Sequence, residues 1–122
     1  EQIFVLDHIA KPRIEDGLIE PWKTQMFEIA KRDNVYCKLS GIATEDNWNK
    51  WKKEDLFPYM DIALEAFGPD RMMFGSDWPV ARLAVEYGPW VEVCREFIAS
   101  LSGDEQSLIE GNVASKVYGL NR

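Results

Sequence analysis

Three side chains capable of acid–base or ligating chemistry lie in or just after short apolar runs of the sequence. His8 follows the first run, Lys38 lies in the second, and Asp77 follows the third. A carboxylate that is partly shielded from water can take a proton from a water molecule or ligate a divalent metal. An imidazole can polarise a carbonyl, bind a metal or move a proton. If the fold brings the three residues together, they predict a hydrolytic site.

Each of these residues could also have a structural role or a role in binding rather than in catalysis. Asp77 could cap the loop that follows its strand, and His8 could be a core histidine bonded to a backbone carbonyl. Lys38 could bind an anionic substrate or form an ion pair with Asp7, because a buried lysine needs a partner charge. Trp78 could form the aromatic wall of a substrate site or simply pack beneath a loop.

Other polar residues give weaker signals. Lys11 and Arg82 follow the first and third runs and could reach a substrate carboxylate or hydroxyl, although each could equally be a solvated loop charge. Ser40 and Ser76 have no base beside them in the sequence. A Ser-His-Asp triad is therefore disfavoured.

The sequence contains one histidine, which argues against a zinc site built only from Cys and His. Asp77 is the candidate metal ligand, and the cofactor is either a divalent metal such as zinc or none. Cys37 and Cys94 are far apart in apolar surroundings, which predicts two buried, reduced thiols in a cytoplasmic protein.

The three apolar runs have the pattern of parallel strands buried on both faces, because they are continuous rather than alternating. Amphipathic helices are predicted between and after them. The first helix carries an inward stripe of Trp22, Met26, Ile29 and Ala30. The predicted strands are residues 3–6, 35–39 and 72–74; the predicted helices are 21–34, 55–67, 88–101, 104–109 capped by Asp104, and 112–118 capped by Asn112.

The predicted strands end at residues 6, 39 and 74, spacings of 33 and 35 residues. A βα unit of an eightfold barrel averages about 31 residues. We therefore predict an α/β fold in which the chain forms roughly the last three βα units of a (β/α)8 TIM barrel. Ligand sites in such folds lie at the carboxyl ends of the strands, where His8, Lys38 and Asp77 are expected.

Composition narrows the class of protein further. The chain has 122 residues, of which 46% are hydrophobic, and a formal net charge of −7. This size and composition predict a single domain over residues 1–122 and exclude a disordered chain. The acidic balance argues against nucleic-acid binding, and no apolar run reaches the roughly 18 residues of a membrane span.

The first predicted strand begins only two residues into the chain, which we interpret as the C-terminal portion of a larger barrel protein. Three strands cannot close a barrel, and both sheet edges would be open. We therefore expect this chain to associate with itself or to require the missing N-terminal part of the barrel, and to be inactive alone.

The ordered set of strand ends resembles amidohydrolase family 2, a TIM-barrel branch of the metal-dependent hydrolases that includes sugar-lactone and pyrone-dicarboxylate lactonases. The resemblance covers essentially the whole chain. Its matching stretches are VLDHIAKP at residues 5–12, VYCKLSG at 35–41, FGPDR at 67–71, FGSDWPV at 74–80 and GNVA at 111–114 with Tyr118.

The resemblance implies lactone hydrolysis, in which Asp77 activates the water and His8 orients or polarises the substrate. Lys38 would lie at the end of the seventh strand of the barrel. The resemblance also implies a small-molecule substrate. The family's His-x-His pair on the first strand is absent here, which leaves the metal requirement open. The alternatives are a zinc-dependent decarboxylase or amide hydrolase on the same barrel, and a noncatalytic α/β interaction module.

Overall fold

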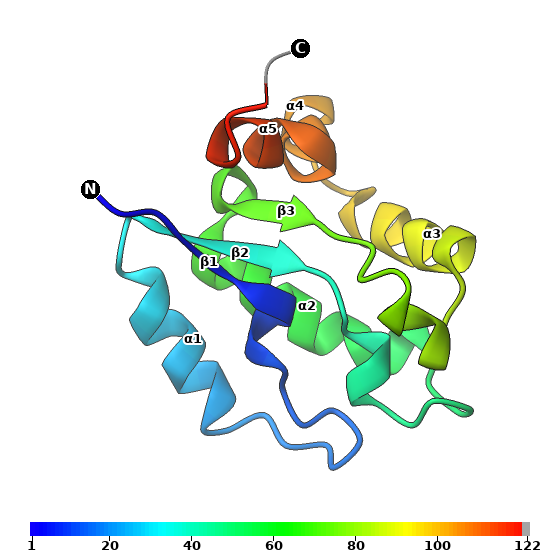
Figure 1. The fold of residues 1–122 in the computed structure, drawn as a ribbon. Helices are drawn as coiled ribbons and strands as arrows, with labels where there is room; N and C mark the ends of the chain where they lie inside the picture. Colours follow the sequence, from blue (N-terminus) through cyan, green and yellow to red (C-terminus); the bar gives the residue numbers. More distant parts are fainter. Residues whose placement is uncertain (121–122) are drawn as a thin grey trace.

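The computed structural model describes residues 1–120, which are built around a three-stranded parallel sheet (Figure 1). The strand order is β1-β2-β3, and both pairings are parallel. All three arrowheads in Figure 1 therefore point the same way, and the loops that leave the strands all emerge at the carboxyl ends of the strands, on one side of the molecule. The strands are β1 (Phe4–Leu6), β2 (Val35–Leu39) and β3 (Met72–Phe74).

Helices follow each strand in the predicted order. None of the helices within residues 1–120 has the length and apolar character needed to cross a membrane. The longer ones are α1 (Trp22–Ala30), α2 (Lys53–Phe67) and α3 (Tyr87–Ile98), followed by α4 (Gly103–Ser107), the π-helical segment η5 (Leu108–Asn112) and α5 (Val113–Val117). Short 3₁₀ turns are η1 (Asp7–Ala10), η2 (Ala43–Glu45), η3 (Pro69–Arg71) and η4 (Val80–Leu83).

The side chains of the sheet divide between two apolar clusters. Cys37, Leu39 and Met72 pack against the inward stripes of α1, α2 and α3. Tyr36 and Met73 instead pack with residues of η5 and α5 in a smaller cluster. Because side chains alternate across a strand, each face of the sheet is covered separately.

The prediction that all three strands are buried on both faces holds for β2 and β3 but is wrong for the first. Ile3 is 43% exposed and Phe4 is 56% exposed. β1 is an edge strand of this sheet, so nothing in the described chain covers its outer side.

Three details of the helices also differ from the sequence prediction. Ile29 was expected in the inward stripe of α1 but is 37% exposed, since no element of residues 1–120 buries that side of the helix. Ser102, rather than Asp104, caps α4, and it forms a reciprocal capping box with Glu105. Asn112 makes no side-chain cap, because the chain runs continuously from α4 through η5 into α5.

Arg71 joins the end of α1 to the start of β2. Its guanidinium donates hydrogen bonds to the backbone carbonyls of Ala30 (2.9 Å), Arg32 (2.9 Å) and Val35 (3.2 Å). It also lies 5.3 Å from the centre of the Phe67 ring. Arg71 thus satisfies the Ala30 carbonyl at the C-terminal end of α1, which the helix itself leaves without a donor, and links that helix end to β2.

Candidate active site

His8 and Asp77 face each other where the loops after β1 and β3 converge. His8 Nε2 lies 3.6 Å from Asp77 Oδ1, and the two side chains are 27% and 16% exposed. This separation is too long for a hydrogen bond. The two groups lie side by side, so a water or a substrate oxygen next to them could bond to both.

Ser40, just after β2, holds the other side of the imidazole. Its Oγ lies 2.7 Å from His8 Nδ1, and the residue is fully buried. Sequence reasoning rejected Ser40 as a nucleophile and assigned it no role. Its position directly after a predicted strand was the only available signal.

Gly41 permits the close approach of the His8 and Asp77 side chains. The residue has φ +59°, and a Cβ there would lie 2.8 Å from His8 Nδ1 and 3.0 Å from Asp77 Oδ2. Gly75 has a similar role, because a Cβ there would come within 2.9 Å of Ser40 Cβ and 3.0 Å of Lys38 Cδ.

The backbone that carries His8 has an unusual conformation. Residues 8–11 all have positive φ, from 44° to 62°, in the left-handed region that L-residues disfavour. Each such residue costs roughly 1–2 kcal/mol. Strain of this kind persists only where surrounding contacts hold the backbone in place.

Ile9 supplies those contacts for the turn. Its side chain is fully buried in the core cluster that includes Cys37 of β2, and its carbonyl accepts a 2.7 Å hydrogen bond from Trp22 Nε1. The turn that aims His8 is thus tied to both α1 and β2.

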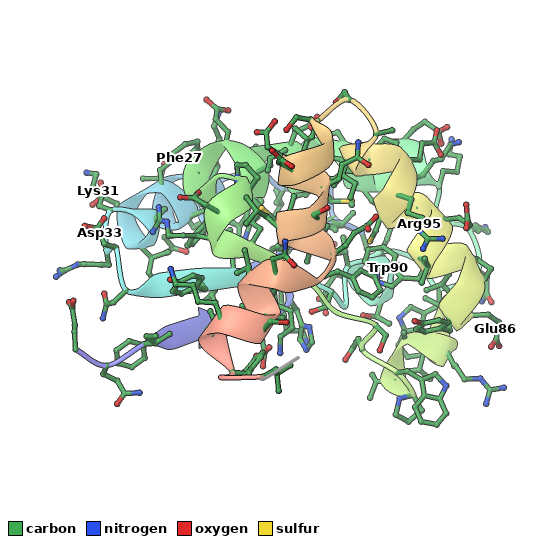
Figure 2. The ribbon with its side chains drawn as sticks, turned by 90° about the horizontal axis from the view of Figure 1, so that it is seen from above. Phe27, Lys31, Asp33, Glu86, Trp90 and Arg95 are labelled. Carbon is green, nitrogen blue, oxygen red and sulfur yellow. The ribbon has the colours of Figure 1, made fainter. Side chains whose placement is uncertain are left out.

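A second tryptophan anchors the loop that carries Asp77. Trp90 Nε1 donates a 2.9 Å hydrogen bond to the Gly75 carbonyl, and Gly75 N–H donates to Leu39 O at 3.0 Å. Figure 2 shows Trp90 on the inward side of α3, while Glu86 lies at the outer end of that helix. Asp77 itself has φ 54°, so its backbone is also left-handed.

Lys38 forms an ion pair with Asp7, which is one of the two roles predicted for it from the sequence. The Nζ–Oδ1 distance is 2.8 Å, and Nζ also lies 5.9 Å from the centre of the Tyr118 ring. The hydrogen bond with Asp7 raises the pKa of Lys38, and the same bond lowers the pKa of Asp7. The ammonium of Lys38 therefore stays charged.

The remaining predicted site residues lie in more exposed positions. Lys11 pairs with Glu45 at 3.3 Å, and Arg82 pairs with Glu86 at 3.3 Å. Trp78 follows Asp77 directly and is 62% exposed. Within residues 1–120, no side-chain hydrogen bond or ion pair joins Lys11 or Arg82 to His8 or Asp77, although the Lys11 backbone N–H donates to the His8 carbonyl at 2.9 Å.

Both cysteines are free and buried, as predicted. Burial raises the pKa of Cys37 to about 12 and also raises the pKa of Cys94. Neither thiol is an activated nucleophile. In the described part of the chain, no three His, Cys, Asp or Glu side chains gather closely enough to hold a metal ion.

Comparison with known sequences places this geometry in context. The sequence model of a family described as Amidohydrolase matches residues 3–120. L-fucono-1,5-lactonase of Burkholderia multivorans is 37% identical over 126 aligned residues, which cover 95% of this chain and 43% of that protein. The chain thus spans less than half the length of this curated relative.

Solved structures agree with the fold. An amidohydrolase from Burkholderia multivorans, crystallised with bound zinc, matches with a TM-score of 0.94 and 36% identity over 98% of this chain and 45% of that one. A hydrolase from Pseudomonas putida, described as acting on 2-pyrone-4,6-dicarboxylic acid, shares the fold with a TM-score of 0.77 and 23% identity over 98% of this chain and 44% of its own. The predicted partial (β/α)8 barrel is confirmed.

Proposed function

The chain belongs to the amidohydrolase family, and we propose that the whole protein hydrolyses a lactone at the site formed by His8 and Asp77. The observation that supports this most strongly is the close approach of His8 Nε2 and Asp77 Oδ1, which lie 3.6 Å apart. A carboxylate beside an imidazole suits the activation of a water next to a carbonyl that the imidazole polarises. The pairing favours a catalytic site over a noncatalytic interaction module.

The proposed reaction is acyl transfer to water. The Asp77 carboxylate accepts a proton from a water molecule as its oxygen attacks the ring carbonyl. Negative charge develops on the carbonyl oxygen, next to the His8 imidazole and the Lys38 ammonium. The ring C–O bond then breaks, and the proton held by Asp77 passes to the departing oxygen, so that lactone and water give one hydroxy acid.

The substrate we propose is a sugar lactone, in line with the lactonase that is 37% identical to this chain. Trp78, exposed beside Asp77, would pack against the ring of the substrate. The Asp7–Lys38 pair offers both an acceptor and donors for substrate hydroxyl groups. Lys11 and Arg82 would contact the substrate only after leaving their ion pairs with Glu45 and Glu86.

A divalent metal such as zinc would be held through Asp77, whose carboxylate is a suitable ligand. A catalytic zinc takes three protein ligands, and residues 1–120 do not supply a group of three. The other ligands would have to come from outside these residues. Such an ion would supply Lewis-acid activation of water. Metal analysis of the whole protein, with activity before and after chelation, separates a metal-free lactonase from a zinc-dependent hydrolase or decarboxylase.

We further propose that another part of the same protein covers the exposed side of β1. A groove of about 460 Å³ lies there, lined by residues that include Phe4, Ile29 and Val35. An uncovered apolar strand edge promotes association. Light scattering should therefore show self-association of the 122-residue chain alone, and that chain should hydrolyse no lactone; a monodisperse, active monomer would refute this proposal.

The decisive test of the function is Asp77→Asn in the whole protein, assayed with a panel of sugar lactones. We expect the turnover number to fall by about 100- to 10,000-fold, because the amide cannot accept the proton. Asp61→Asn, which alters an exposed carboxylate on α2, is the matched control and should keep full activity. Near-normal turnover in Asp77→Asn would exclude the assignment.

A further inference from the structure

Ser40 is the one buried polar residue among residues 1–120, and its environment is unusually restrictive. The residue is fully buried, and its only side-chain hydrogen-bond partner in this part of the chain is His8 Nδ1, at 2.7 Å. Gly75 packs against Ser40 so closely that a Cβ at position 75 would lie 2.9 Å from Ser40 Cβ. The hydroxyl therefore has little freedom to find another partner.

We propose that Ser40 is a positioning residue that determines which nitrogen of His8 carries the proton. A hydroxyl has one hydrogen to donate, and leaving a buried donor without an acceptor costs about 1–3 kcal/mol. His8 Nδ1 is the acceptor within reach of Ser40. The hydroxyl thus donates to Nδ1, so the neutral imidazole carries its proton on Nε2.

The opposite arrangement leaves a group unsatisfied. If Nδ1 carried the proton and donated it to Oγ, the Ser40 hydrogen would point into buried space without an acceptor. Gly41 also lies against the imidazole, where a Cβ would come within 2.8 Å of Nδ1.

This tautomer decides whether His8 Nε2, which lies beside Asp77, donates or accepts a hydrogen bond. Nε2 faces Asp77 Oδ1 across 3.6 Å, so its N–H is free to donate to a third atom. Given the proposed function, on which this step rests, that atom is the carbonyl oxygen of the lactone. An imidazole with a protonated Nε2 offers no lone pair there, so His8 acts as a hydrogen-bond donor and not as a metal ligand through Nε2.

The test is nitrogen NMR of the imidazole, which reports the tautomer directly. His8 is the only histidine of the 122-residue chain, so every imidazole signal belongs to it. At a pH where the ring is neutral, we expect a protonated Nε2 and an unprotonated Nδ1. Ser40→Ala should produce a mixture of tautomers, whereas Ser100→Ala, which changes an exposed residue in the turn after α3, should leave the spectrum unchanged.

If the chain or the variant does not fold alone, the same spectrum is recorded in the whole protein, where His8→Gln identifies the signals to follow. A wild-type imidazole protonated on Nδ1, or an unchanged tautomer in folded Ser40→Ala, would overturn the proposal. Kinetics provide a second readout. Ser40→Ala should lower the kcat of the whole protein about 10- to 100-fold with little change in KM, because the donor is misaligned rather than the substrate site lost.

The two hypotheses fail separately. The expected tautomer in a protein that hydrolyses no lactone would retain the role of Ser40 and refute the proposed function. A protein that hydrolyses a lactone but carries the His8 proton on Nδ1 would retain the proposed function and refute the role of Ser40.

Discussion

Gly41 and His8 approach so closely that the fold leaves no room for a side chain between them: a Cβ at position 41 would lie 2.8 Å from His8 Nδ1. Gly41→Ala should therefore displace the imidazole and separate it from Ser40 and Asp77. We expect a loss of about 100-fold in kcat/KM of the whole protein, the effect of misplacing a catalytic group by about 1 Å.

Gly17→Ala is the matched control for this substitution. Gly17 has φ +66°, close to that of Gly41, but a Cβ there would meet nothing within 4 Å. Both alanines carry the same backbone penalty, so a loss of activity in Gly41→Ala alone isolates the contact with His8. Equal effects in the two variants would mean that backbone conformation, not the contact, is responsible.

Trp22→Phe should destabilise the turn that carries His8. The substitution keeps most of the apolar contact but removes the indole donor, and it leaves the carbonyl of buried Ile9 without its partner. We expect the free energy of unfolding to fall by about 1–3 kcal/mol in chemical denaturation. Trp48→Phe removes a similar bond to Thr44 O at an exposed position and should cost less.

Arg71→Lys should destabilise the fold although it keeps the charge. An ammonium cannot reproduce the planar fork that bonds the carbonyls of Ala30, Arg32 and Val35. We expect a loss of about 1.5–3 kcal/mol in the free energy of unfolding. The control is Arg95→Lys, which changes an exposed pair with Glu92 and should be nearly neutral. Similar melting curves for both variants would contradict the structural role of Arg71.

The thiols should be inert in the folded chain and should make its stability depend on alkaline pH. Burial raises the pKa of Cys37 from 9.0 to about 12, so the unfolded state loses the thiol proton first as the pH rises. This contribution is complete below about pH 9 and declines between about pH 9 and pH 12. Cys37→Ala should flatten the fall in unfolding free energy over that window, and a thiol reagent at pH 8 should react only after unfolding.

The family and the partial barrel could be predicted from the sequence because both depend on local patterns. Continuous apolar runs at a period near 33 residues predicted β1, β2 and β3, and the polar residues after them indicated the position of the site. The burial of Phe4 and Ile29 could not be predicted correctly, because it depends on which elements cover the outer side of β1. Lys38 illustrates a different limit, since its pattern fitted an ion pair and a substrate contact equally well.

The inner structure of the site also escaped prediction. Ser40 and Gly41 follow β2 and contact His8, which follows β1, and one sequence carries no record of that proximity. The left-handed backbone of residues 8–11 was equally hidden, because Ile9 and Ala10 are residue types that normally avoid it. Their conformation is imposed by Trp22 and the packing around Ile9.

The native backbone of residues 8–11 has a conformation that the chirality of L-amino acids disfavours. Ala10 has φ 62° and is exposed, so its side chain contributes little packing to offset that penalty. D-alanine at this one position would favour the same dihedral angles. It could be introduced in a synthetic peptide of residues 1–36 that is ligated to the rest of the chain at Cys37. The turn that aims the imidazole would then be favoured by the stereochemistry of its own residue, with less dependence on the indole that now restrains it.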